Sequence, residues 1–376
     1  MRNTERRGRV HAATDELRRL HPQRRPRSGA GGCPGAAWRS RWPQEEGQER
    51  AQTAAESAGT GTAAGLEGQA PCDDVAGAGK AAGEPREVRT MELGYFLVAF
   101  IDLLGQRDHL RRLTELPNAA DRNDPIVTAF RNSWGAVDGL RRCFLDYFAA
   151  AAEEGDFSKS LEPAQRDQLR RVMRSEVIHY AFSDSVIIAV PLKAAQDDPT
   201  PLNGVHLALL AAASNATLSL AAKHALRGGI DVGVCARVSD REVYGSALER
   251  AYTLESRKAV YPRILVGQEL LRYLTLSRDQ PRDTPESEIR ATVAESTLRL
   301  VFRDTDGKPA LDYLGQEVLR VFGASLKPPT VEQAYAFVVA EEERWRAAGN
   351  TTLAERYGKV HEYFDSRVHL WSVTRR

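Results

Sequence analysis

The stretch Tyr95-Phe-Leu-Val-Ala-Phe-Ile-Asp102-Leu-Leu-Gly105 indicates how the folded part of this chain is organised. Its first seven residues are all apolar, which is typical of a strand that is buried on both faces. A carboxylate follows at Asp102, and Gly105 stands where a chain can turn from a strand into a helix. The pattern predicts a central strand that ends in an aspartate just before a strand-to-helix turn.

Strand and helix patterns continue from this strand towards the end of the chain. Apolar positions at helical spacing occur over 126–150 and, more weakly, over 160–175. The residues from Val177 to Pro191 predict a β-hairpin, with Ser183-Asp184-Ser185 as its turn. The later predicted elements are a helix over 203–226, a strand over 227–236, a helix over 244–260, a strand over 263–266, strand-like pieces within 290–320 around the turn Asp304-Thr-Asp-Gly307, and charged helices over 330–373. This order predicts an α+β fold around one core.

Residues 1–90 differ from the rest of the chain in composition. They are rich in Arg, Gly, Ala, Pro and Glu and contain few β-branched or aromatic residues. Such a segment buries too little apolar area to offset its chain entropy, so we expect it to be disordered. A second hypothesis is that the natural chain begins at Met91 and that 1–90 reflects a mis-assigned start, which the intact mass of the native protein would decide. We therefore divide the chain into an extension over 1–90, a domain over 91–325 and a C-terminal helical segment over 326–376.

Composition also indicates the cellular compartment and the class of partner to expect. The formal net charge is +1, so no nucleic-acid or membrane-surface partner is indicated. The four cysteines form no C-x-x-C pair, which excludes a zinc site or disulfide framework of the usual spacing and fits a reducing cytoplasm. No run approaches the roughly 20 apolar residues of a membrane span, and the basic N-terminus has no apolar signal region behind it. We expect a cytoplasmic protein.

Two aspartates stand where predicted strands end. Taken alone, Asp102 is more often the N-cap of a following helix, and Asp184 more often a turn residue. If the central strand and the hairpin are neighbours in one sheet, however, both carboxylates lie at the same edge. Two hard oxygen ligands at one edge suit Mg²⁺ or Mn²⁺, with a triphosphate completing the coordination. The glycines at Gly105 and in Arg227-Gly-Gly allow close approach of a phosphate to the backbone, although tight turns use glycine equally often.

At this point the sequence resembles the class III nucleotidyl cyclases, through short motifs in the same order. Phe100-Ile-Asp-Leu-Leu-Gly105 resembles their first metal motif, and Phe182-Ser-Asp184-Ser resembles the hairpin with the second metal-binding aspartate. Leu226-Arg-Gly-Gly-Ile-Asp-Val-Gly233 is similar to the next strand, and Tyr244-Gly245-Ser-Ala-Leu248-Glu249-Arg-Ala251 to the following helix. Arg263-Ile-Leu-Val takes the place of the strand after that, so the resemblance covers about 95–270.

The resemblance implies a fold, a cofactor and an assembly. The fold would be a class III cyclase-like, ferredoxin-like palm sheet with helices packed on it. The assembly would be a homodimer in which each site takes its aspartates from one chain and the second helix from the other. Two Mn²⁺ or Mg²⁺ ions per site would be held by Asp102, Asp184 and the backbone carbonyl of Leu103, with Phe100 and Gly105 at the substrate. General-base duty would fall on Asp102 and the metal-bound 3′-hydroxyl.

The chain departs from the family in the second helix. Glu249 stands at the family's asparagine position, and Thr253 stands where the arginine that steadies the transition state is expected. Arg257 lies one helical turn beyond Thr253 on the same face, so it is a candidate for the missing positive charge. Arg250 is a second candidate, for which a solvated helix face is the better interpretation.

The residue four positions before the hairpin aspartate bears on the nucleobase. Purine cyclases carry a lysine or glutamate there, whereas this chain has Tyr180, whose bulk favours a smaller pyrimidine. A packed strand aromatic is nearly as good an interpretation of Tyr180. The sequence around Tyr180 is similar to that of the pyrimidine cyclases of bacterial Pycsar anti-phage systems. Those enzymes make cyclic UMP or cyclic CMP, which activates a separate effector. The resemblance implies UTP in preference to CTP as substrate; the trigger and the physiological metal stay open.

Three alternatives compete with the enzyme hypothesis. A catalytically inactive cyclase-homology domain would bind nucleotide or dimerise, and Glu249 and Thr253 favour it. Another palm-type enzyme, such as a diguanylate cyclase, would need a Gly-Gly-Asp/Glu-Glu-Phe hairpin, but the turn here is Ser183-Asp184-Ser185. A protein-interaction module would be built on the helices over 330–373, which are better explained as a cap on the domain or as part of a dimer contact.

Overall fold

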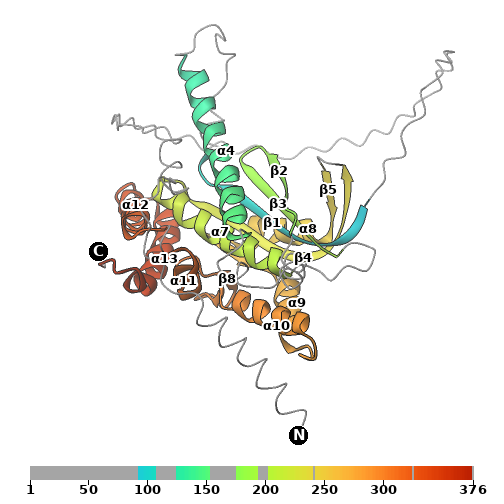
Figure 1. Cartoon of the computed structure of the whole chain (residues 1–376). Coiled ribbons are helices and arrows are strands. Elements are labelled where there is room, and N and C mark those ends of the chain that lie inside the picture. Colours follow the sequence, from blue (N-terminus) through green and yellow to red (C-terminus); the bar gives the residue numbers. More distant parts are fainter. Residues whose placement is uncertain are drawn as a thin grey trace, which may run out of the picture. The chain divides into compact units, whose positions relative to one another are not determined.

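The computed structural model describes residues 92–106, 124–152, 175–193, 202–239, 242–323 and 326–374 (Figure 1). These ranges include the predicted central strand, the predicted hairpin and the predicted C-terminal helices. The extension 1–90, Met91 and most of the weak helical pattern over 160–175 lie outside them.

The predicted central strand is present as β1 (Glu92–Leu103), between two antiparallel neighbours. Successive side chains of a strand point to opposite faces of the sheet, so β1 contributes to two cores. Its odd-numbered residues from Leu97 to Leu103 are buried in the larger core, and its even-numbered residues from Phe96 to Phe100 in a smaller one. Asp102 belongs to the even-numbered series and therefore faces the same side as the smaller core.

The sheet is mixed and has eight strands in the described residues. Its order is β2-β3-β1-β4-β6-β8-β7, with β5 paired to β4, and all pairs are antiparallel except β4 with β6. The strands are β2 (Ile178–Phe182), β3 (Ser185–Lys193), β4 (Leu226–Ser239), β5 (Glu242–Gly245), β6 (Ile264–Val266), β7 (Val301–Arg303) and β8 (Pro309–Leu311). The predicted hairpin is confirmed as β2 and β3, which places Asp184 beside the end of β1.

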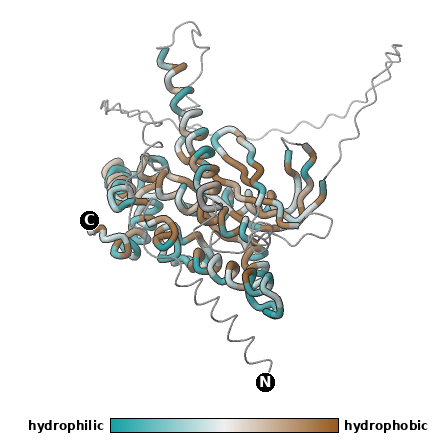
Figure 2. Tube along the Cα trace, viewed as in Figure 1, coloured by the Kyte–Doolittle hydropathy of each residue, from teal (hydrophilic) through white to brown (hydrophobic). Residues whose placement is uncertain are grey.

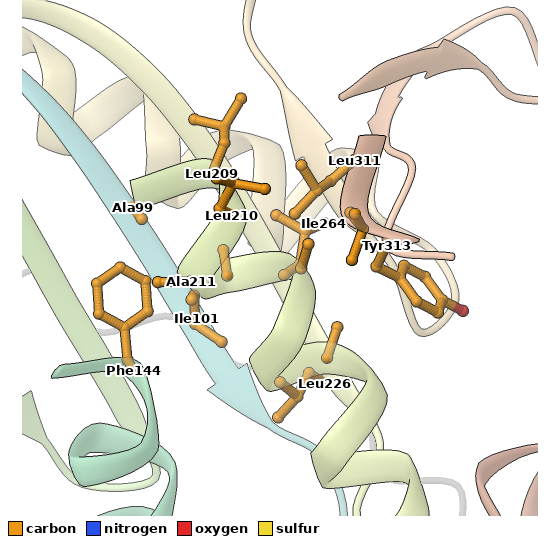
Figure 3. Packing of buried hydrophobic residues seen from close by; sticks show 14 of the residues in the cluster. Ala99, Ile101, Phe144, Leu209, Leu210, Ala211, Leu226, Ile264, Leu311 and Tyr313 are labelled. Carbon is orange, nitrogen blue, oxygen red and sulfur yellow. The ribbon is translucent and has the colours of Figure 1, made fainter. Parts of the chain in front are cut away.

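Two helices, α4 (Pro125–Ala152) and α7 (Leu202–Ala221), pack together against the face of the larger core. Figure 3 shows Leu209 and Leu210 of α7 beside Ala99 and Ile101 of β1, with Phe144 of α4 nearby. Among the described helices, α7 alone is long and apolar enough to cross a membrane, but 89% of its apolar window is buried inside the protein. Figure 2 shows the same apolar concentration along α7 and the central strands. A buried core helix explains these features.

The opposite face of the sheet carries a short helix that continues as a π-helical turn. Helix α8 (Ser246–Thr253) runs directly into η1 (Leu254–Lys258), and the backbone N–H of Ala259 donates to the carbonyl of Leu254 to close the wider turn. The helix packs on β4 and β1 through its small buried residues, Ala247 and Ala251.

The remaining elements are mainly helical, and several of their residues join the larger core. They are α9 (Gln268–Asp279), α10 (Pro285–Leu298), α11 (Gln316–Phe322), α12 (Pro328–Ala347), α13 (Thr351–Arg367) and the 3-10 turn η2 (Val368–Trp371). Helix α12 packs on α7 and on α13, and Tyr335, Phe364 and Trp371 are buried in the same core as β1. The predicted C-terminal helices are therefore part of the body of the fold.

The strand-like pieces predicted around the turn Asp304-Thr-Asp-Gly307 are present as β7 and β8, but the helix that precedes them was not predicted. Residues 285–298 form α10, whose N-terminus is closed by a capping box between Thr284 and Ser287, with Pro285 in the first turn. That pattern is a helix-start signal, because the side chains satisfy backbone N–H groups that the first turn leaves without partners. Only 301–303 and 309–311 are strands.

The packing of η1 on β4 requires a glycine at position 229. A Cβ atom on Gly229 would lie 2.3 Å from the carbonyl oxygen of Ala251 and 2.5 Å from the Cβ of Leu254. We predict that Gly229→Ala lowers the free energy of unfolding by about 1–3 kcal/mol, because the helix must move off the sheet. The matched control is Gly135→Ala in α4, where no atom lies within 4 Å of the added methyl. It should raise stability by about 0.5–1 kcal/mol. Urea unfolding measures both, and equal effects would contradict the prediction.

A partly buried histidine makes the fold sensitive to mild acid. His206 of α7 hydrogen-bonds through Nδ1 to the hydroxyl of Thr297 in α10, at 3.1 Å, and burial lowers the pKa of His206 from 6.5 to about 4. The unfolded chain therefore takes up this proton first, so stability is complete above about pH 6.5 and is lost as the pH falls towards 4. We predict that His206→Gln flattens this part of the curve of unfolding free energy against pH, measured by urea unfolding. Parallel curves for the two proteins would contradict the assignment.

Candidate functional site

The hairpin turn brings Asp184 to the end of β1. Phe182 and Ser185 are paired across the strands, so Ser183 and Asp184 form a two-residue loop, and Ser183 takes a left-handed φ of 56°. The backbone N–H of Leu103 donates to the carbonyl oxygen of Asp184 at 3.1 Å. This bond fastens the turn to β1, one residue beyond Asp102.

Asp102 is buried between the two neighbours of β1. It is paired with Ser185 on one side and with Arg227 on the other. The Ser185 hydroxyl donates to Asp102 Oδ1 at 2.9 Å, and the Nη2 atom of Arg227 lies 3.7 Å from Asp102 Oδ2. Asp102 and Asp184 are only 5% and 8% exposed. Both predicted ligand residues therefore occupy one end of the sheet, largely removed from bulk water.

A second ion pair adjoins Asp102. Arg227 donates from Nε to Glu255 Oε1 at 2.7 Å, and its Nη2 atom lies 2.5 Å from the same oxygen. Glu255 comes from η1 and is 3% exposed. We call Asp102, Asp184, Arg227 and Glu255 the site cluster. Carboxylate oxygens of this kind are the ligands that a divalent cation prefers.

The donor set of the site cluster fits a divalent metal that keeps part of its coordination for water and substrate. Asp102, Asp184 and the Leu103 carbonyl are the hard oxygen donors at this end of the sheet, and Mg²⁺ is commonly held by one or two carboxylates together with substrate phosphates. No group of three or more His, Cys, Asp or Glu side chains placed to hold a metal occurs among the described residues. Residues 107–123, which follow Gly105 and Gln106, lie outside them. The helix expected after the strand-to-helix turn at Gly105, with its expected phosphate contact, therefore also lies outside the described residues.

The predicted substrate aromatics lie on the same face as the site cluster. Phe100 is 8% exposed, and its ring meets Tyr252 of α8 edge-on with 5.3 Å between centroids. Tyr180 is half-buried and packs against the smaller core, opposite Ile187. Phe182, next to the turn, is 69% exposed. Phe100 is therefore a packing residue in this chain, whereas Phe182 and Tyr252 have rings in contact with solvent.

The two candidate arginines of the second helix lie apart from the site cluster of their own chain. Arg250 donates from Nη1 to the carbonyl oxygen of Val232 at 2.8 Å, five residues along β4 from Arg227. Arg257 is exposed on η1 and has no ion-pair partner among the residues that the structure describes. Thr253 donates from its hydroxyl to Glu249 at 3.0 Å. Within the part of the chain that the structure describes, Arg227 is a cation next to Asp102.

A buried network holds the end of η1. Arg263 donates to Asp304 at 2.7 Å and to Asp306 at 2.6 Å, in the turn between β7 and β8, and reaches the carbonyl of Lys258 at 3.4 Å. The bond from Arg263 holds the pKa of Asp306 well below its ordinary value. Because Lys258 is the last residue of η1, this network fixes the segment that carries Glu255.

Arg227, Glu255 and Ser185 were not predicted as site residues. Arg227 was noted only for the glycines that follow it, although a charged residue at the start of an apolar strand is a usable signal. Glu255 gives no local signal, because its contact with Arg227 depends on how η1 packs on β4. Comparison of the chain with protein-family models, with curated proteins and with solved structures found no match.

The ion pair within the site cluster should show strong coupling in stability. We predict that Arg227→Met lowers the free energy of unfolding by about 3 kcal/mol, because it leaves the buried Glu255 carboxylate without its guanidinium. Arg227→Met combined with Glu255→Leu should cost less than Arg227→Met alone, since no charge then remains unpaired at this contact. Urea unfolding of the two single variants and the double variant measures the coupling, and additive losses would contradict it.

Proposed function

We propose that this protein is a metal-dependent nucleotidyl cyclase that converts a pyrimidine nucleoside triphosphate into its 3′,5′-cyclic monophosphate and pyrophosphate. The observation that carries the proposal is the meeting of Asp102 and Asp184 at one end of the sheet, joined through the Leu103–Asp184 backbone bond and flanked by Arg227. Two carboxylates and one guanidinium form a place where a metal-bound triphosphate is held through opposite charges.

The topology supports the finer fold assignment. The first strands and helices follow the order β1-α4-β2-β3-α7-β4, and these strands lie in the order β2-β3-β1-β4 with antiparallel neighbours. This is the β-α-β-β-α-β arrangement of ferredoxin-like folds, to which the palm of class III cyclases belongs. We therefore interpret this part of the chain as a cyclase-like palm.

Each residue of the site cluster has a role in the proposed reaction. Two Mn²⁺ or Mg²⁺ ions at Asp102, Asp184 and the Leu103 carbonyl would supply charge neutralisation and activation of the 3′-hydroxyl. The 3′-oxygen forms a bond to the α-phosphorus while the bond to the β-phosphate oxygen breaks and pyrophosphate leaves. The proton of the 3′-hydroxyl passes to Asp102, and Arg227 donates hydrogen bonds to the phosphate oxygens on which charge develops.

The base, the assembly and the biological setting extend this proposal. Tyr180 lies on the face of the site cluster, and its bulk favours a pyrimidine, with UTP preferred to CTP on the resemblance to Pycsar cyclases. The same resemblance suggests a cytoplasmic homodimer whose product activates a separate effector in anti-phage defence. In such a dimer Arg257, which is exposed on η1, is the candidate cation for the site of the other chain.

One observation favours a second function, that of an inactive cyclase-homology module. Thr253 and Glu249 occupy the positions of the family's arginine and asparagine, and they bond to each other along α8. They offer no cation to a transition state. A protein of this kind would still bind a metal-bound triphosphate at Asp102 and Asp184 without converting it.

The test is an assay of the full chain with ATP, GTP, CTP and UTP in separate reactions with Mn²⁺, with products resolved by chromatography. We predict a cyclic pyrimidine product that is lost by at least about a hundredfold in Asp102→Ala and Asp184→Ala, because each removes a metal ligand. Asp283→Ala, at an exposed position between α9 and α10, is the matched control and should retain full activity. Binding of a triphosphate without any product would support the inactive module, and a purine product would overturn the assignment of the base.

A further inference from the structure

We propose that Glu255 is a positioning residue, which holds the guanidinium of Arg227 so that its remaining N–H groups face a bound triphosphate. The inference rests on the proposed function, because it assigns a task within the same site. It adds a residue of η1 to a site that otherwise comes from the ends of β1 and β4 and from the β2–β3 turn.

The geometry of the ion pair supports these two roles, in which Glu255 holds the guanidinium and Arg227 contacts the triphosphate. Arg227 has five N–H groups, and those of Nε and one of Nη2 are directed to Glu255 Oε1, at 2.7 and 2.5 Å. Among the described residues, three N–H groups remain for other partners, one on Nη2 and two on Nη1. The N–H of Nη2 and one N–H of Nη1 form the end of the guanidinium, and the Nη2 atom is 3.7 Å from Asp102 Oδ2. An end-on guanidinium edge is the geometry that binds two phosphate oxygens at once.

Burial separates the roles of the two residues. Glu255 is 3% exposed, whereas the Arg227 side chain is 22% exposed. Arg227 is therefore the more exposed member of the pair, and we assign the contact with the triphosphate to its guanidinium. We assign to Glu255 an effect on the reaction through the guanidinium that it binds.

The backbone explains why Glu255 is placed so firmly. The π-helical turn of η1 lies against β4, and the N atom of Glu255 is 3.0 Å from the position of a Cβ on Gly229. Arg227 and Gly229 are two residues apart, on the same face of β4. A fixed carboxylate above a fixed strand leaves the arginine few alternative rotamers, which lowers the entropy lost on binding a phosphate.

The experiment measures kcat and KM for the nucleotide that the wild-type full chain converts, in five variants. We expect Glu255→Leu to lower kcat/KM by roughly 10- to 100-fold, the range found for residues that orient a functional group. Glu255→Gln keeps an oxygen acceptor for Arg227 and should stay within about fivefold of wild type. Glu332→Leu, at an exposed position of α12, is the matched control and should be unchanged.

The last two variants, Arg227→Ala alone and Arg227→Ala combined with Glu255→Leu, separate positioning from a general structural role. If Glu255 acts only through Arg227, then adding Glu255→Leu to Arg227→Ala should change kcat/KM by less than about twofold. A further loss comparable to that of Glu255→Leu alone would overturn the proposal, and so would wild-type kinetics in Glu255→Leu. Urea unfolding of each variant shows whether it is folded. If Glu255→Leu does not fold, Glu255→Gln is the variant on which the test is made.

A binding measurement distinguishes this proposal from the proposed function. If the wild type forms no cyclic product from any nucleotide, the cyclase proposal fails, and calorimetric titration with inorganic triphosphate and Mn²⁺ tests Glu255 alone. Glu255→Leu should then bind about tenfold more weakly than wild type, with Glu332→Leu unchanged. Equal affinities of wild type and Glu255→Leu, or no binding by the wild type, would overturn the positioning role.

Discussion

The register of β1 between β3 and β4 is the constraint on which the rest of the structure depends. Side chains alternate between the faces of a strand, so a shift by one residue would turn Leu97 and Ile101 out of the larger core and turn Asp102 into it. The same register places Asp102 opposite both Ser185 and Arg227. Core packing and the site cluster are therefore specified together, and selection for one preserves the other.

The site cluster is hard to explain by stability alone. Burying a charge is costly, and a buried ion pair seldom stabilises a fold more than apolar side chains of the same volume would. Here three buried carboxylates and a guanidinium lie at the edge of a sheet that is otherwise well packed. Such a group of buried charges is reasonable where a cation and a phosphate bind during function, because preorganised charges then need no reorganisation when the reaction occurs.

Local patterns were sufficient for the elements that surround the site. The apolar run of β1 and the Ser183-Asp184 turn are specified by side chains close in sequence, so they were predicted correctly. Helix α10 was missed because its start signal at Thr284 and Pro285 was not weighed, although it stands in the sequence. The pairing of Arg227 with Glu255 was beyond local reasoning, since it joins residues 28 positions apart through a π-helical turn.

The orientation of η1 also bears on Thr253, which stands where class III cyclases carry an arginine. Glu255 and Arg257 are only two residues apart, yet Glu255 is 3% exposed and faces β4, whereas Arg257 is exposed. Two helical residues at this spacing point to different sides, so a helix that buries Glu255 beside Asp102 turns Arg257 away from it. Under the proposed function, Arg257 is therefore a candidate for the site of a second copy of the chain. Arg227 is the cation that the described residues place beside Asp102, so the threonine at position 253 does not by itself exclude catalysis.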